Sequence, residues 1–287
     1  MEACAERSVV ISYFTENGRY LASVRGASSG NVLLRRAQYR LSDDLAAAAR
    51  LAGSMVAAKT SNCRTTLLRA LRDRPEGTGA QRLREAATEL EGQLRAIAHA
   101  DDLDRLRGLE GLAARDYFGA FDDLISQQKE DFRFTGRSRR PPLDRVNALL
   151  SFVYTLLVHD ARGALESVGL DPAVGFLHRD RPGRPGLALD LIEEFRPFVA
   201  DRVVLSLINL KQVTAANFRT TESGAVLLDD EGRKALLVAY QTRKQEEIHH
   251  AFLGEKTTVG MLVHLQALLL ARAVRGDLDG YPAFFWR

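Results

Sequence analysis

Glu110 is the first residue whose surroundings in the sequence suggest chemistry. It lies in the segment Gly108–Tyr117, which has the composition of a helix, and the residues that share its helical face are small or aromatic: Ala113, Ala114 and Tyr117. The alanines leave space over the carboxylate, so we expect Glu110 to face inward, where a cation could reach it. A solvated acid on the helix surface is the alternative.

Three further residues could act together with Glu110. His178 ends the apolar stretch Val174–Leu177 and begins an arginine-rich loop, so its ring would have apolar support behind it and polar space ahead. Asp190 and Glu193 are three residues apart and share a face if this segment is a helix. Paired acids among leucine, isoleucine and phenylalanine are costly to bury unless a cation neutralises them. A structural histidine and a salt bridge from Glu193 to Arg196 are the simpler interpretations.

Taken together, these residues predict a metal site made of two carboxylates and one imidazole. Oxygen ligands with a single nitrogen suit Mg²⁺ or Mn²⁺. The two cysteines, Cys4 and Cys63, have neither the spacing of a zinc site nor that of a disulfide framework. A reducing, cytoplasmic location is the natural interpretation of this cysteine usage.

A second metal motif occurs near residue 250. Glu246 and His249 form Glu-x-x-His, a spacing found in the di-iron sites of helix bundles, within a helix predicted from Glu231 to His250. Only one copy is present, and no matching pair of single glutamates accompanies it. We therefore interpret the motif as a solvated helix end and keep an iron-binding helical metalloprotein as an alternative function.

Two basic loops lie near the predicted metal ligands in the sequence. The segment 133–145 contains a single acid and five arginines: Arg133, Arg137, Arg139, Arg140 and Arg145. The second loop directly follows His178 and carries three: Arg179, Arg181 and Arg184. Arginine offers a planar fork of donors that suits phosphate, so these loops indicate a phosphodiester substrate. Solvated charge is the alternative for each loop, and the net charge of +3 adds little to the argument.

A mostly helical frame must position these residues. The predicted helices are 31–71 with a break near Ser42 and Asp43, 81–98, from Asp101 or Asp102 to about 128, 143–168, 187–195, 198–210, 231–250 and 258–275. Arg196–Pro197 predicts a bend or stop, and Phe218–Leu228 predicts a short hairpin. No Gly-x-x-x-x-Gly-Lys phosphate loop is present, which argues against nucleotide hydrolysis.

The first residues differ from the rest of the chain. Val9–Phe14 and Arg19–Arg25 predict two strands joined by the turn Thr15–Gly18. The predicted fold class is α+β, predominantly α, with a partial amino-terminal β-domain at 1–26, a linker at 27–30 and an all-helical catalytic domain at 31–287. No stretch reaches the roughly 18 apolar residues that a membrane helix needs, so no membrane contact is expected.

At the residues described above, the chain resembles the CRISPR-associated endonuclease and integrase family that inserts spacers in adaptive immunity. Five segments carry the resemblance, in the family's order and over nearly the whole chain: Gly30–Tyr39, Leu109–Phe118, Asp144–Tyr154, Gly169–His178 and Leu187–Pro197. The separation between His178 and Glu193 also suits the family. Several motifs in order are far more specific than any one of them.

The resemblance implies metal ligands at Glu110, His178 and Glu193, with Asp190 as a supporting catalytic acid. Whether Asp190 or Glu193 is the third ligand stays open. The resemblance also implies DNA-facing roles for Asn147, Tyr154 and Arg196. Together with the loop arginines Arg137, Arg139, Arg140 and Arg181, these residues make up the predicted DNA-binding set.

The resemblance further implies partners. Double-stranded DNA, as spacer precursor and as CRISPR repeat, is the expected substrate, and the β-domain is expected to form a homodimer. Two such dimers would bridge a small partner protein. The family's β-domain has several strands ahead of a segment like Met1–Glu6, so we expect residues 1–26 to be only part of that domain.

The predicted function is therefore metal-dependent cleavage and joining of DNA, in which a DNA 3′-hydroxyl attacks the repeat backbone and inserts a spacer into the CRISPR array. A non-catalytic DNA-binding scaffold is the main alternative. Such a scaffold would bind DNA in a salt-dependent and metal-independent way.

Overall fold

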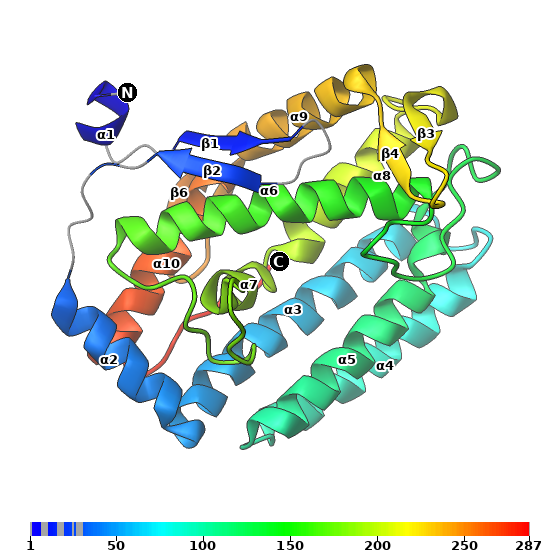
Figure 1. Cartoon of the computed structure of the whole chain (residues 1–287). Helices are drawn as coiled ribbons and strands as arrows, with labels where there is room; N and C mark the ends of the chain where they lie inside the picture. Colours follow the sequence, from blue (N-terminus) through cyan, green and yellow to red (C-terminus); the bar gives the residue numbers. More distant parts are fainter. Residues whose placement is uncertain (1, 7–10, 16–19, 25, 27–30, 287) are drawn as a thin grey trace.

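The computed structural model describes the chain except for residues 1, 7–10, 16–19, 25, 27–30 and 287. The described part is mostly helical, which confirms the predicted α+β, predominantly α class (Figure 1). Its α-helices are α1 (Glu2–Glu6), α2 (Val32–Asp43), α3 (Leu45–Asp73), α4 (Ala80–Ala98), α5 (Leu103–Gly119), α6 (Arg145–Ser167), α7 (Gly186–Ile192), α8 (Arg202–Asn209), α9 (Asp230–Gln245) and α10 (Val259–Arg275). The strands are β1 (Ile11–Phe14), β2 (Tyr20–Val24), β3 (Phe218–Thr220), β4 (Val226–Leu228), β5 (Glu247–His250) and β6 (Glu255–Thr258).

Helix α3 lies at the centre of the fold. It packs against α4 and α5 on one side, and it also packs against the helical turns at 196–201 (Figure 1). Asp44 starts α3 by accepting hydrogen bonds from the backbone N–H groups of Ala46 and Ala47. Alanines along α3 allow neighbouring helices to approach closely, so Ala52 and Ala58 are fully buried. The break predicted near Ser42 and Asp43 is therefore confirmed at Asp44.

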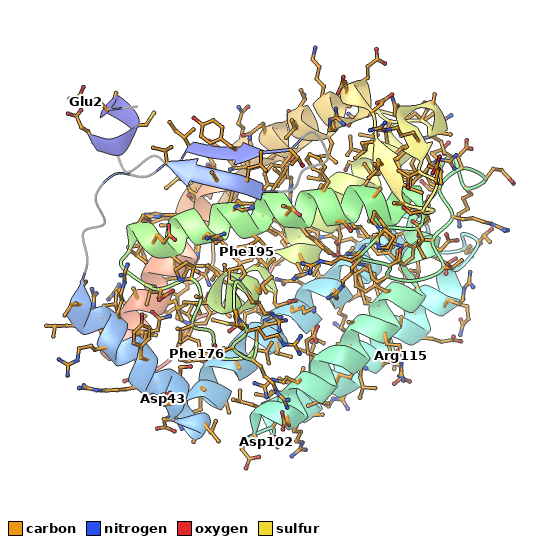
Figure 2. All side chains as sticks on the ribbon, in the orientation of Figure 1. Glu2, Asp43, Asp102, Arg115, Phe176 and Phe195 are labelled. Atoms are coloured by element: carbon orange, nitrogen blue, oxygen red, sulfur yellow. The ribbon has the colours of Figure 1, made fainter. Side chains whose placement is uncertain are left out.

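Helices α6, α7 and α10 form the rest of the frame around the core. Helix α6 packs against both α7 and α10, while α2 packs against α10 and α3. Phe176 and Phe195 lie in the interior of this assembly, whereas Asp43, Asp102 and Arg115 lie at its rim (Figure 2). Among the described residues, no helix is both long and apolar enough to cross a membrane.

Three predicted element ends differ in the structure. Helix α5 ends at Gly119 rather than near 128, because Ala120 begins a short 3₁₀ turn, Phe121–Leu124. Arg196–Pro197 does not stop the chain's helical path: a π-helix, Arg196–Asp201, leads directly into α8. A proline is tolerated in the first turn of a helix because its missing N–H would lack a partner there.

The third difference removes a predicted motif. Helix α9 ends at Gln245, Glu246 caps it, and β5 continues from Glu247 into a hairpin with β6 that the sequence reasoning missed. Glu246 and His249 therefore do not share a helical face, and Glu246 pairs with Arg243 instead. The geometry that a di-iron helix motif needs is absent from this segment.

Both hairpins that the sequence predicted are present. Strands β3 and β4 pair antiparallel with Phe218 opposite Leu228. Near the amino terminus β1 pairs with β2, and Ile11 lies opposite Val24. Most of the turn predicted at Thr15–Gly18 and the linker predicted at 27–30 lie outside the described residues. The division into parts 1–26, 27–30 and 31–287 stays a prediction.

Candidate functional site

Two of the predicted metal ligands meet at one cation that belongs to the protein. Glu110 comes from the middle of α5 and Glu193 from the carboxy-terminal end of α7, and both carboxylates pair with the ammonium of Lys59 on α3. Lys59 donates a hydrogen bond to Glu110, and its Nζ lies 2.6 Å from Oε2 of Glu193. Lys59 and Glu193 are buried, while the Glu110 side chain keeps 28 % of its exposure. The site therefore opens to solvent on the α5 side.

Opposite charges nearby keep both Glu193 and Lys59 charged although both are buried. Burial acts to raise the pKa of Glu193, but the opposing charges of Arg196, Lys59 and His178 outweigh it and lower that pKa to about 2. Burial acts to lower the pKa of Lys59, but Glu193 and Glu110 raise it overall. Arg196 adds an ion pair of 3.2 Å to the other oxygen of Glu193. At neutral pH Glu193 is therefore ionised and lies between two cations, Lys59 and Arg196.

His178 is held in a fixed orientation by Asp190. Its Nδ1 lies 2.5 Å from Oδ1 of Asp190, and its own backbone N–H donates to the same oxygen at 3.0 Å. The second oxygen of Asp190 accepts from the backbone N–H groups of Phe176 at 2.6 Å and Leu177 at 3.0 Å. Such a carboxylate sets the tautomer of a histidine and leaves Nε2 available for a ligand.

A glycine makes this close packing possible. A Cβ on Gly175 would lie 2.7 Å from Oδ2 of Asp190 and 2.8 Å from the backbone of Gly186. The loop that carries His178 therefore closes directly over the first turn of α7, where the N–H of Gly186 donates to the carbonyl of Ala173. The local sequence Val174-Gly-Phe-Leu-His178 allows that approach because only glycine fits at its second position.

Asp190 and Glu193, which the sequence left as alternatives, have different surroundings. Asp190 is fully buried and both of its oxygens accept hydrogen bonds from the His178 loop. Glu193 instead turns toward Glu110 through Lys59. Within the described residues no group of three or more His, Cys, Asp or Glu side chains is arranged to hold a metal ion. In this arrangement the Lys59 ammonium lies between the two glutamates.

Asp201, Tyr117 and Tyr154 form a buried hydrogen-bond network that two arginines contact. Asp201, at the end of the π-helix, accepts hydrogen bonds from the hydroxyls of Tyr117 at 3.0 Å and Tyr154 at 2.6 Å. Burial raises the pKa of Asp201 to about 6 although both hydrogen bonds lower it. The guanidinium groups of Arg137 and Arg196 lie 5.2 and 4.6 Å from the ring centre of Tyr154. The ring of Tyr154 therefore makes cation–π contacts with both Arg137 and Arg196.

Asn147 occupies a comparable supporting position at the start of α6. It is fully buried, its Oδ1 accepts from Arg137 and from the backbone N–H of Ser138, and its amide donates to Gly136 and Asp144. All of these partners belong to the basic loop or to the helix cap that follows it. Asn147 and Tyr154 were both predicted to face DNA. The structure buries both and brings both into contact with one arginine of the basic loop, Arg137.

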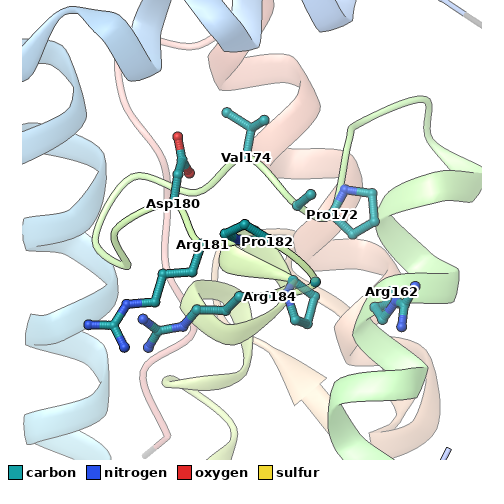
Figure 3. A pocket seen from close by; sticks show the side chains of 10 residues that line it. Arg162, Pro172, Val174, Asp180, Arg181, Pro182 and Arg184 are labelled. Atoms are coloured by element: carbon teal, nitrogen blue, oxygen red, sulfur yellow. The ribbon is translucent and has the colours of Figure 1, made fainter.

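The outward-facing charges come from the loops themselves. Arg139 and Arg140 are exposed on the first loop, and Arg181 is exposed on the second. Figure 3 shows Arg181 and Arg184 extending in the same direction while Asp180 turns away. Together with Arg162 of α6 and several prolines, these two arginines line a cavity of about 490 Å³ directly after His178. Asp180 lines the same cavity, so the second loop presents two arginines beside one acid.

Sequence reasoning missed Lys59 and Asp201. The signal for Lys59 was an isolated cation in an apolar and small-residue stretch, Met55–Ala58, of a long helix. A buried lysine requires an anionic partner, so the predicted inward-facing acids were its candidates. Asp201 gave no comparable signal, because the sequence showed it only as one residue of the predicted helix 198–210.

Comparisons with known proteins agree over most of the chain. The family model described as CRISPR associated protein Cas1 matches residues 1–242. A curated relative from Chlorobaculum tepidum, named CRISPR-associated endonuclease Cas1 1, is 56% identical over 284 residues, which are 99% of this chain and 83% of that protein.

Two solved structures have the same fold. One is a casposase bound to its integration product, with a TM-score of 0.85 and 24% identity over 99% of this chain and 77% of that one. The other is a chain of a Cas6-RT-Cas1–Cas2 complex, with a TM-score of 0.81 and 25% identity over 99% of this chain and 30% of the larger one.

Proposed function

The chain belongs to the Cas1 family, the endonucleases and integrases of CRISPR spacer acquisition, and we propose that Glu110, His178 and Glu193 hold a divalent cation that serves its cutting and joining of DNA. Mg²⁺ and Mn²⁺ are the proposed ions, because two carboxylates and one imidazole suit them.

One observation carries the ligand assignment. Glu110 and Glu193 come from different helices, yet their carboxylates already share a single cation, the Lys59 ammonium. Glu193 is charged at neutral pH, and the His178 ring is close enough to lower the pKa of Glu193. A divalent cation that takes the place of the ammonium would meet both carboxylates. Asp190 acts through His178 and does not bind the ion itself, since the His178 loop engages both of its oxygens.

The chemistry follows from these positions. A bound divalent ion would polarise the attacked phosphate and stabilise the leaving oxygen. Asp190 keeps the proton on Nδ1 of His178, so that Nε2 offers its lone pair to the site. In joining, a DNA 3′-hydroxyl loses its proton and forms a new bond to phosphorus, while the backbone 3′-oxygen leaves and takes up a proton. Water in place of the hydroxyl gives hydrolysis, which is nuclease activity at the same site.

DNA would be held by the arginines of the two basic loops. Arg139, Arg140 and Arg181 are exposed and can contact phosphates directly. Arg137 and Arg196 lie on the ring of Tyr154, which holds their guanidinium groups at the edge of the site. Asn147 contributes by fixing Arg137. Such contacts position DNA and carry little sequence information.

The proposed partners are double-stranded DNA, a second copy of this chain and a small partner protein of the Cas2 type. A casposase with this fold is known bound to its integration product, and a related chain is part of a complex with Cas2. We also place the protein in the cytoplasm, where Cys4 and Cys63, both free thiols, would remain reduced.

The test compares the wild type with His178→Ala. Each protein is incubated with Mn²⁺, a labelled duplex with free 3′-hydroxyls and a supercoiled plasmid that bears a CRISPR repeat, together with the small partner protein. We expect label to be joined to plasmid by the wild type only, while salt-sensitive DNA binding persists in both. Joining by His178→Ala at the wild-type rate would contradict the proposed ligand set, and DNA binding without joining in either protein would favour the scaffold function.

A further inference from the structure

The last described residues pack against the segment that follows Glu193. After α10 the chain runs without regular secondary structure, yet Tyr281, Phe284 and Trp286 are buried. We call residues 281–286 the strap. An irregular segment exposes its backbone polar groups unless other parts of the chain bind them, so its hydrogen-bond partners show what holds it.

The first anchor of the strap is Asn62 on α3. Its Nδ2 donates to the carbonyl of Phe284 at 2.9 Å, and its Oδ1 accepts from the N–H of Trp286 at 2.8 Å. The same Nδ2 donates to the backbone carbonyl of Glu194 at 2.7 Å. Asn62 is fully buried, and one amide therefore joins three segments: α3, the strap and the residue after Glu193.

The second anchor is the side chain of Glu194. Its carboxylate accepts hydrogen bonds from the hydroxyl of Tyr281 and from the backbone N–H of Phe284. Gln266 of α10 donates to the same carboxylate at 3.1 Å and to the hydroxyl of Tyr281 at 2.8 Å. Glu194 is fully buried, and the hydrogen bonds to its carboxylate come from the strap and from Gln266, so its role is to bind the strap.

Aromatic packing fixes the strap between these anchors. The ring of Phe284 stacks on Phe195 with a centroid distance of 5.7 Å and also packs against Phe198 at 5.1 Å. Trp286 packs against Phe198 at 5.1 Å. Phe195 and Phe198 flank Arg196, the residue that pairs with Glu193. The strap therefore packs on the residue before Arg196 in the chain and on the residue two positions after it.

The anchors are close in sequence to the site residues themselves. Asn62 is three positions after Lys59, which puts the two on neighbouring parts of one helical face. Glu194 directly follows Glu193, in a stretch of turns between the end of α7 and the π-helix. The ion pair with Lys59 ties Glu193 to α3 directly. The hydrogen bond from Asn62 to the carbonyl of Glu194 adds a second link between this turn and α3.

We propose that the strap is a positioning element of the active site, which fixes Glu193 and Arg196 relative to Lys59 and Glu110 through Asn62, Glu194 and Phe284. The strap contains none of the proposed metal ligands and none of the arginines proposed to hold DNA. Its effect is to set the spacing of the two carboxylates that share a cation. This inference rests on the proposed metal site at Glu110, His178 and Glu193.

The test measures Mn²⁺ binding in the absence of DNA, by calorimetry or by electron paramagnetic resonance. The double variant Tyr281→Phe/Phe284→Ala loosens the strap without changing Asn62 or Glu194. We expect its Kd for Mn²⁺ to rise by about 10-fold, the scale on which outer partners of metal ligands act. Phe284→Leu, which keeps an apolar side chain and the same backbone N–H, should restore most of the affinity when it replaces Phe284→Ala.

Leu90→Ala is the matched control, because Leu90 is a fully buried side chain of α4 outside the strap. This variant should lower thermal stability while leaving the Kd for Mn²⁺ unchanged. If Leu90→Ala weakens Mn²⁺ binding as much as the double variant does, the strap is only structural and the inference is wrong. Should the double variant fail to fold, Tyr281→Phe alone removes one hydroxyl and must still raise the Kd.

The failure of this inference and that of the proposed function give different results. Mn²⁺ binding that His178→Ala abolishes but the strap variants leave unchanged would overturn the strap inference alone. Wild-type protein that binds no Mn²⁺, or binds it equally well after His178→Ala, would overturn the proposed metal site and the strap inference with it. DNA binding in EDTA should be equal in all variants, and its loss from the double variant alone would contradict a role confined to the site.

Discussion

Replacement of Lys59 by methionine tests whether the ammonium and the metal ion compete for the same carboxylates. Lys59→Met keeps an unbranched side chain of similar length and removes its charge. In the wild type an incoming divalent ion must break the contacts of Lys59 to Glu110 and Glu193. Hydrogen bonds to charged groups contribute about 1.5–3 kcal/mol each. The more exposed contact, to Glu110, is counted as adding little. One contact's worth of competition should therefore tighten Mn²⁺ binding by roughly 10- to 100-fold, since 1.4 kcal/mol corresponds to about a factor of ten.

The same substitution should destabilise the metal-free protein. It leaves the buried Glu193 with Arg196 as its remaining cation and leaves Glu110 without its partner. Removing one member of a buried ion pair costs about 3–5 kcal/mol, and the remaining ion pair to Arg196 puts the expected loss near the lower value. For a chain of this size that loss lowers Tm by roughly 6–12 °C. Mn²⁺ should restore more stability to the variant than to the wild type, because the variant binds it more tightly.

Calorimetric titration with Mn²⁺ gives Kd, and thermal unfolding with and without Mn²⁺ gives the stabilities. Lys244→Met is the matched control, because Lys244 also forms an ion pair, 2.7 Å from Asp160, far along the chain from the proposed ligands. It should change neither Kd nor the response to Mn²⁺. A Kd that is unchanged or weaker in Lys59→Met would refute the competition and show that Lys59 supports metal binding instead.

Three further predictions concern the neighbouring residues. Asp190→Asn should weaken Mn²⁺ binding by about 10- to 100-fold in a direct titration, because His178 loses the carboxylate that orients it; unchanged binding would contradict that role. Burial raises the folded-state pKa of Asp201 from 3.8 to about 6, so the folded chain binds more protons than the unfolded chain in this range and stability falls as pH rises from about 4 to 6. Asp201→Asn should flatten that part of a plot of Tm against pH, and an unaltered slope would count against the assignment. Arg139→Ala/Arg140→Ala should reduce the slope of log K against log salt by about 0.9 for each phosphate of duplex DNA that the variant no longer neutralises, as measured by anisotropy; an unchanged slope would place these arginines away from the DNA.

Local signals in the sequence predicted the helical frame well. A capping aspartate marked one start, because Asp102 accepts the backbone N–H groups that begin α5. The break predicted near Ser42 and Asp43 lies at Asp44, whose role as the cap of α3 only the structure showed. The hairpin at Phe218–Leu228 was equally readable from its turn residues. The end of α9 was not, because Glu246–His250 has no glycine or proline to stop a helix, and pairing with β6 draws it into a strand.

The sequence alone could not assign separate roles to neighbouring polar residues of the site. Asp190 and Glu193 are three residues apart, so helical periodicity puts both on one face and cannot tell which of them is a ligand. Their roles separate only because α7 is short: the closing His178 loop encloses Asp190, whereas Glu193 lies at the helix end, where it can reach Lys59. Asn147 is a similar case, since a polar residue at the start of a helix can face a ligand or hold a loop, and its four hydrogen bonds show that it holds the loop.

The sequence by itself determined which chemistry is available to this protein: inward-facing acids, one supported histidine and two arginine-rich loops, each visible from its near neighbours. It also determined the family, because five motifs occur in the expected order. Only the tertiary structure decided which groups meet. Lys59, Glu110 and Glu193 are far apart in the chain, and nothing local to any of them encodes the others. Their meeting depends on the packing of α3, α5 and α7 around one core, which every buried residue of the chain sets together.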